Sequence, residues 1–190
     1  MEAPGAELWY SGKDRTMKYE IINLKDVKVI GIAREIDMDK GPQECPLFWQ
    51  EYGEKFMNPI SEGRMENAQQ QTVMENHIGE FGVCFCHKPD KFLYVIAGAY
   101  KGGQIPEGMH VYDLPDGKWV KFYFEGGMEA FQQQYAEVYQ KWAPEHPELP
   151  LRMDVNMEWY EGMDIASPEY PCGVMVPVKL SRSALLAKNL

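Results

Sequence analysis

Residues 109–142, MHVYDLPDGKWVKFYFEGGMEAFQQQYAEVYQKW, contain the pattern that decides the fold. The runs 109–114 and 118–124 are rich in β-branched and aromatic residues, and the Pro-Asp-Gly sequence at 115–117 is a strong turn signal. These runs predict two strands joined by a turn. The residues that follow place aromatic and apolar side chains at helical spacing, which predicts a helix over residues 128–142.

The same order of elements recurs in the first half of the chain. There the sequence predicts two strands within 19–36 that break near Lys25-Asp26, a helix over 46–57 that begins at Pro46, a short helix around 65–74, and a β-hairpin of 78–87 with 91–100. Predicted strands at 152–161 and 172–178 complete the second half.

An internal duplication explains this repeated order, because strand–strand–helix–strand–strand occurs twice. We expect pseudo-repeats at about 17–101 and 108–179, with an irregular arm at 1–16 and a tail at 180–190. The expected fold class is α+β, in which duplicated β-α-β-β units form a curved antiparallel sheet with helices on one side. A central ligand cleft is expected between the halves.

The composition excludes several classes of function. The chain has 190 residues, of which 45% are hydrophobic and 13% aromatic, so disorder is not expected. A formal charge of −10 opposes binding to phosphate backbones, and we expect no direct nucleic-acid binding. The sequence has no apolar run long enough to span a membrane and no signal-peptide pattern at its start. We therefore expect a cytoplasmic protein without a membrane partner.

Motifs for metals, cofactors and common catalytic machinery are absent from the sequence. Cys84-Phe85-Cys86-His87 lacks the second half of a tetrahedral metal site, and its two thiols are expected to pack on one strand face. The four histidines occur singly, and no G-x-S-x-G, G-x-G-x-x-G or P-loop sequence occurs. We expect no metal and no cofactor.

Acidic residues lie among many aromatic ones, and residues 153–160 are the clearest case. Val155, Met157 and Trp159 alternate with Asn156, Glu158 and Tyr160, so one strand face is apolar and the other polar. The polar face is either a solvated outer face or a pocket wall in which Glu158 binds an organic cation between aromatic rings. The pattern alone leaves both interpretations open.

Nine short segments agree in order and spacing with a known family. They are Val29–Ile32, Trp49–Phe56, Gly82–Cys84, Tyr94–Gly98, Ile105–Met109, Leu114–Trp119, Gly126, Glu158–Tyr160 and Val174–Val178. In these segments the chain resembles the GyrI-like small-molecule-binding family, over roughly residues 17–179. The resemblance implies the effector-binding fold of AraC-type and MerR-type multidrug-responsive transcription regulators. Those regulators carry a helix-turn-helix ahead of this domain, and residues 1–16 are too few for one, so we expect a stand-alone module.

The resemblance also implies a set of ligand-binding residues. Glu158 and Tyr160 match a Glu-x-Tyr strand pattern whose acid commonly faces the ligand. The helix pattern falls on Trp49 and Tyr52, the strand tyrosine on Tyr94, and an aromatic replacement on Trp119. Together these residues predict binding or sequestration of lipophilic, cationic aromatic drugs or effectors. The alternative is that the protein is a GyrI-like hydrolase of reactive cyclopropane-containing toxins, with Glu158 as general base. A protein partner or a homodimer is a further hypothesis.

Overall fold

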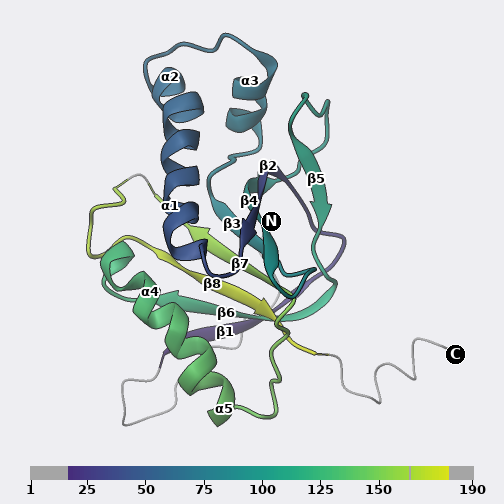
Figure 1. Cartoon of the computed structure of the whole chain (residues 1–190), viewed down its shortest axis with the longest axis vertical. Helices are drawn as coiled ribbons and strands as arrows, with labels where there is room; N and C mark the ends of the chain where they lie inside the picture. Colours follow the sequence, from purple (N-terminus) through teal and green to yellow (C-terminus); the bar gives the residue numbers. More distant parts are fainter. Residues whose placement is uncertain (1–16, 163, 180–190) are drawn as a thin grey trace, which may run out of the picture. The chain divides into compact units, whose positions relative to one another are not determined.

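The computed structural model describes residues 17–162 and 164–179 and divides into two compact units. Unit 1 combines the residues up to Lys25 with those from Pro115 onward, and unit 2 is Asp26–Leu114. Each unit has an antiparallel sheet and a long helix, so the fold class is α+β, as the sequence predicts (Figure 1). The predicted arm at 1–16 and tail at 180–190 lie outside the described residues.

Unit 1 is a four-stranded sheet covered on one face by a long helix. Its strands, in spatial order, are β1 (Lys18–Leu24), β6 (Gly117–Phe124), β8 (Cys172–Pro177) and β7 (Val155–Tyr160). The helical segment comprises α4 (Gly127–Glu137), a π-helical turn η2 (Val138–Trp142) and α5 (Ala143–Glu145). Phe131, Val138 and Trp142 bury one side of this helix against the sheet. We call the covered side the helix face of unit 1.

Unit 2 has the same architecture. Its strands, in spatial order, are β5 (His110–Asp113), β2 (Lys28–Asp37), β4 (Lys91–Ala99) and β3 (Phe81–Phe85). Its helices are α1 (Gly41–Tyr52), the π-helical turn η1 (Gly53–Met57), α2 (Asn58–Ser61) and α3 (Ala68–Glu75). Phe48, Tyr52 and Phe56 pack against the sheet in one buried cluster. The predicted hairpin is confirmed, because β3 pairs with β4.

The two units do not coincide with the two halves of the chain. β1 pairs with β6, although β2 follows it in the sequence, and β5 pairs with β2, although β6 follows it. β1 and β5 therefore each precede, along the chain, a strand of the unit to which they do not belong. The break predicted near Lys25-Asp26 occurs where unit 2 begins, and Asp26 there adopts a left-handed conformation with φ of 54°.

The two long helical segments share a local irregularity. In each of them an α-helix widens into a five-residue π turn, which is followed by a short helix whose second residue is proline, Pro59 or Pro144. Proline has no N–H and its ring collides with the carbonyl four residues earlier, and the wider π turn gives that ring room. The same irregular helical segment thus occurs in both units, which supports the interpretation of a duplication.

The start of the first helix differs from the sequence prediction. The helix begins at Gly41, with Pro42 in its first turn, so Pro46 lies inside the helix rather than at its start. Pro46 has no N–H to donate, so the helix lacks the backbone hydrogen bond that this position would otherwise make to the carbonyl of Pro42. None of the helices in the described part of the chain combines the length and apolarity needed to cross a membrane.

Each sheet also buries its other face. In unit 1 these side chains are Trp119, Val155, Met157, Trp159 and Met175, each at most 6% exposed. In unit 2 they include Val29, Val83, Val95 and Ala97, each at most 1% exposed. Both faces of the two sheets are therefore core, which accounts for much of the aromatic and methionine surplus in the sequence.

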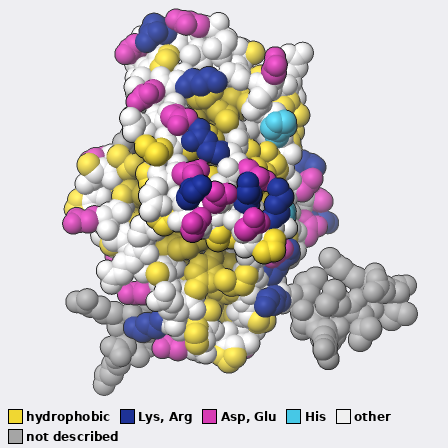
Figure 2. Space-filling view, in the orientation of Figure 1, with side chains coloured by type: hydrophobic (Ala, Val, Ile, Leu, Met, Phe, Trp, Pro, Cys, Tyr) yellow, Lys and Arg dark blue, Asp and Glu magenta, His cyan; other side chains and the backbone are white. Residues whose placement is uncertain are grey.

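The surface carries acidic and basic side chains next to one another, as the dark blue and magenta atoms of Figure 2 show. Ion pairs such as Arg34–Glu51 at 2.5 Å and Lys88–Glu35 at 2.5 Å join exposed partners. Lys88 and Lys91 lower the pKa of the Glu35 carboxyl by hydrogen bonding and charge. Exposed pairs of this kind stabilise a fold little.

Candidate functional site

The polar face of β7 lies on the helix face of unit 1. Glu158 pairs with Val174 and Tyr160 with Cys172, and both of these β8 residues belong to the buried cluster under α4. Because side chains directly opposite in an antiparallel pair share a face, Glu158 and Tyr160 point to the same side as that cluster. Both are partly buried. Glu158 and Tyr160 therefore lie on the helix-covered face of the sheet and not on a fully solvated one.

Glu158 is held by an aromatic neighbour. The Tyr160 hydroxyl donates a hydrogen bond to Glu158 Oε2 at 2.9 Å. The Tyr160 ring in turn lies 5.7 Å, between centroids, from the ring of Phe131 on α4, which lies 6.3 Å from that of Tyr135. A carboxylate with a fixed hydroxyl donor beside a row of rings is a suitable environment for a cation with apolar substituents.

Three predicted site residues come together in unit 2. The Trp49 indole N–H donates to the Tyr94 hydroxyl at 2.9 Å, and the rings of Trp49 and Tyr52 meet edge to face at 5.9 Å. Tyr52 is 4% exposed and Tyr94 2%, whereas Trp49 is partly buried. The Tyr52 hydroxyl donates to the Ile78 carbonyl at 2.6 Å, and burial raises the pKa of Tyr52. Trp49 is therefore the least buried of the three.

Trp119 is placed apart from Glu158 within unit 1. It alternates with Val120 and Phe122, which belong to the cluster under α4, so it points to the opposite face of the sheet. Its side chain is 0% exposed, and its indole N–H donates to the Pro115 carbonyl at 2.9 Å. The structure thus brings Glu158 together with Tyr160 but not with Trp119.

Two buried polar atoms have no hydrogen-bond partner among the described residues, namely Trp142 Nε1 and Asn156 Oδ1. Asn156 is 7% exposed and stands two residues before Glu158 on β7. An unpaired buried polar group costs about 1–3 kcal/mol, so such groups are uncommon without a role. The sequence shows Asn156 on the polar face of β7, but nothing in the sequence marks it as buried or unpaired.

The cysteines pack as the sequence predicts. Cys84 and Cys86 are partly buried against the core cluster of unit 2, together with Cys45 of α1. Cys172 is 0% exposed in unit 1, and burial raises the pKa of its thiol. Among the residues that the structure describes, no three His, Cys, Asp or Glu side chains are grouped as metal ligands would be.

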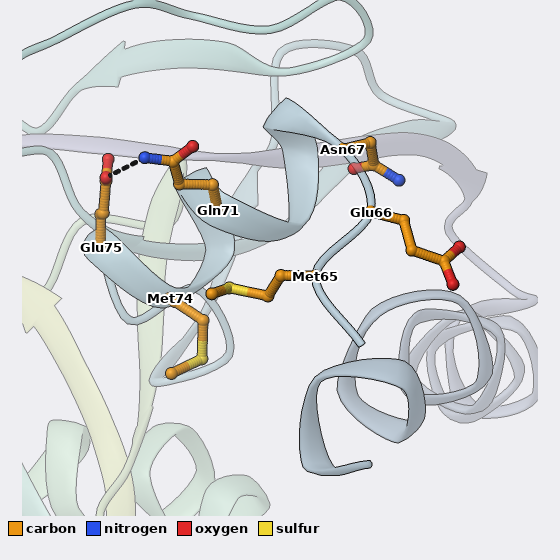
Figure 3. Close-up of a pocket in the computed structure, with 6 residues that line it drawn as sticks. All are labelled: Met65, Glu66, Asn67, Gln71, Met74 and Glu75. Carbon is orange, nitrogen blue, oxygen red and sulfur yellow. Dashed lines mark hydrogen bonds between the residues drawn. The ribbon is translucent and has the colours of Figure 1, made fainter. Parts of the chain in front are cut away.

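Unit 2 has a hollow of about 580 Å³ between α3 and the segment that leads into this helix. Its lining residues are Met65, Glu66, Asn67, Gln71, Met74 and Glu75. Figure 3 shows Met65 directed toward Met74, and Gln71 bonded to Glu75. Met65 is 61% and Met74 49% exposed, so a ligand here would stay largely in water. Ligand pockets usually bury most of the ligand, which argues against this hollow as the ligand site.

A family model defines the class of protein. The model of the GyrI-like small molecule binding domain matches residues 17–179, and the chain belongs to this family. The family match spans both units and every strand and helix named above. No curated protein matches the chain.

Solved structures with similar folds have low sequence identity to the chain. SAV2435, solved bound to tetraphenylphosphonium, is 20% identical, with a TM-score of 0.67 over 86% of this chain and 94% of that one. A putative bacterial transcription regulation protein from Staphylococcus aureus MU50 is 22% identical, with a TM-score of 0.67 over 87% and 100%. The integron cassette protein VCH_CASS2 from the mobile metagenome of Vibrio cholerae is 13% identical, with a TM-score of 0.55 over 85% and 95%. These likenesses concern the fold.

Proposed function

We propose that this protein binds lipophilic aromatic cations on the helix face of β7, with Glu158 as the counter-charge. The observation that carries this proposal is the partly buried Glu158 carboxylate, which accepts a hydrogen bond from Tyr160, whose ring in turn lies 5.7 Å from that of Phe131. Membership of a small-molecule-binding family supports it, as does the binding of tetraphenylphosphonium, a lipophilic aromatic cation, by the similarly folded SAV2435.

The energetics favour cations over other aromatic molecules. Each ring face that meets the cation contributes about 0.5–2 kcal/mol through its quadrupole. A carboxylate that a ligand desolvates must be neutralised, because an isolated buried charge is costly. An anion of the same size would meet the same rings and an unfavourable carboxylate. Selection by charge, rather than by shape, is therefore the expected signature of this site.

Trp49 and Tyr94 stay predictions on which the proposal does not depend, because both belong to unit 2 and the proposed site lies on unit 1. The Trp49 indole N–H donates a hydrogen bond to the Tyr94 hydroxyl, which fixes the two rings relative to each other. Tyr52 and Trp119 stay predictions on which the proposal does not depend, because both are core residues whose polar atoms bond to backbone carbonyls. The hydrolase alternative also stays a prediction, and turnover that Glu158→Gln abolishes would favour it.

The test compares two probes of the same shape and opposite charge. Tetraphenylphosphonium and tetraphenylborate are titrated calorimetrically into the protein in potassium-free buffer. We expect the cation to bind and the anion to bind at least about tenfold more weakly, a difference of about 1.4 kcal/mol or more. Glu158→Gln should weaken the cation by about tenfold or more and should leave the anion unchanged or improved.

Glu161→Gln is the matched control. It changes the net charge by the same amount, at the residue that directly follows β7. The Glu161 side chain is 66% exposed and lies 3.9 Å from Lys121. Its replacement should change the dissociation constant of the cation less than about twofold. Equal losses in Glu158→Gln and Glu161→Gln would mean that only net charge matters and would refute a specific counter-charge.

A further inference from the structure

The Asn156 side chain is a buried hydrogen-bond acceptor without a partner. Asn156 is 7% exposed, and among the described residues nothing bonds to its Oδ1. A protein that needed only packing at this position would be more stable with an apolar side chain of similar size, because the oxygen loses its water without compensation. A buried amide oxygen that stays unpaired is therefore available for a ligand.

Asn156 lies beside the proposed counter-charge. It stands two positions before Glu158 on β7, and side chains two apart on a strand share a face. That face is the helix face of unit 1, where Glu158 is bonded to Tyr160. The two side chains start about 7 Å apart along the strand, a distance that one polar group of a ligand can span between them.

The chemistry of the pair distinguishes two kinds of cation. Glu158 attracts any positive charge, whereas Asn156 Oδ1 accepts a hydrogen bond only from a ligand that has an N–H or O–H group. Protonated amines and amidinium groups carry their positive charge on N–H donors, and quaternary ammonium and phosphonium ions have none. On the basis of the proposed function, we propose that this site prefers lipophilic cations with N–H donors, through a hydrogen bond to Asn156 Oδ1.

The test uses two probes that differ only in the N–H. N,N-dimethyl-3,3-diphenylpropylamine is protonated at neutral pH, and its N-methyl quaternary salt has the same charge and rings without a donor. The wild-type protein should bind the protonated amine about fivefold to tenfold more tightly in calorimetric titrations. Tighter or equal binding of the quaternary salt would overturn the inference without any variant.

Variants at the acceptor give a second, independent result. Asn156→Leu should lower the affinity for the protonated amine to about that for the quaternary salt. The affinity for the quaternary salt itself should change less than about twofold. Asn156→Asp keeps an oxygen acceptor at this position and should keep the preference for the amine. Asn156→Leu should also leave the thermal midpoint of the free protein unchanged or raised, since it removes an unpaired oxygen from the core.

The outcomes separate this inference from the proposed function. If both probes bind and depend on Glu158, but Asn156→Leu weakens them equally, the site binds cations and Asn156 does not select among them. If neither probe nor tetraphenylphosphonium binds, the proposed function fails and the preference fails with it. An Asn156 oxygen that serves only a structural water gives the first of these results.

Discussion

The hydroxyl of Tyr160 has a specific task, which is to hold the Glu158 carboxylate in one orientation. Its hydrogen bond to Oε2 joins two residues of the same strand face at 2.9 Å. The Tyr160 ring is itself fixed against Phe131 of α4. A charged group that is positioned before the ligand arrives loses less conformational freedom on binding, which increases affinity.

Removing this hydroxyl should weaken cation binding modestly. Tyr160→Phe keeps the ring beside Phe131 and deletes the donor to Glu158. We expect tetraphenylphosphonium to bind about threefold to tenfold more weakly, in keeping with a hydrogen bond to a charged group. Calorimetric titration measures this, with Tyr112→Phe on β5 of unit 2 as a control that should behave as wild type. An unchanged affinity in Tyr160→Phe would show that the carboxylate needs no positioning.

Tyr52 makes stability depend on alkaline pH. Burial raises its pKa above the ordinary value of 10.0. A raised pKa in the folded state gives stability that is fully present below the unfolded pKa and is lost as pH rises through the folded pKa. The free energy of unfolding should therefore fall above about pH 10, by at most about 1.4 kcal/mol per pH unit for this group.

Tyr52→Phe isolates the contribution of this hydroxyl. Near pH 8 the variant should lose about 1 kcal/mol, because the Ile78 carbonyl loses the donor that it has at 2.6 Å. Between about pH 10 and 11 its stability should decline less steeply than that of the wild type. Urea unfolding at the three pH values measures both effects. If the free energy of unfolding falls equally steeply with pH in the variant and the wild type, a raised pKa of Tyr52 is contradicted.

At the residue scale, the sequence predicts Glu158 as a candidate ligand-binding residue but does not single out Asn156. The reason is physical. Alternation along a strand shows which side chains share a face, so Asn156, Glu158 and Tyr160 are correctly grouped. It does not show which face is covered, since that depends on a helix elsewhere in the chain. The family resemblance, which also carries no information on faces, groups Trp119 with Glu158, although the two lie on opposite faces of the unit 1 sheet.

At the element scale, the missing side chain of Gly173 on β8 leaves room for the indole of Trp159 to pass over this strand. A Cβ built at Gly173 would lie 2.0 Å from the Phe122 carbonyl oxygen and 2.8 Å from Trp159 Nε1. That indole nitrogen donates to the same Phe122 carbonyl at 3.0 Å. The absence of a side chain thus allows the β8 backbone to approach β6 while Trp159 of β7 reaches over it.

Two glycine substitutions should therefore have opposite effects. Gly173→Ala forces the strand or the indole to move and should cost about 3 kcal/mol of unfolding free energy. Gly53→Ala should stabilise by about 0.5–1 kcal/mol, because Gly53 has a helical φ of −58° and nothing within 4 Å of the added carbon. Denaturant unfolding measures both. A destabilised Gly53→Ala or a neutral Gly173→Ala would contradict the packing described here.

The sequence predicts the existence and type of the helices and strands better than their ends. The helix expected from Pro46 begins at Gly41, because Pro42 is the proline in its first turn and the sequence alone does not show which of the two prolines marks the start. The π turns η1 and η2 have no signal of their own in the pattern of apolar residues. Only the prolines that follow them, at 59 and 144, hint at a departure from regular helix.

At the scale of the whole chain, the order of the elements can be predicted, whereas the strand pairs beyond the local β3–β4 hairpin cannot. The Pro-Asp-Gly turn at 115–117 joins β5 and β6 as expected, yet β5 pairs with β2 and β6 with β1. A turn signal fixes a change of direction locally, whereas strand pairing depends on contacts distant in sequence. The pseudo-repeat boundaries thus stay a prediction, and the compact units exchange an edge strand across them.

A crystal structure with tetraphenylarsonium would test the proposed site most directly, because arsenic gives an anomalous signal that locates the cation without assumptions. We predict an arsenic peak on the helix face of β7, beside the Glu158 carboxylate and the Tyr160 and Phe131 rings. A peak in the hollow between Met65 and Met74, or no peak in crystals grown at saturating ligand, would contradict a cation site at Glu158.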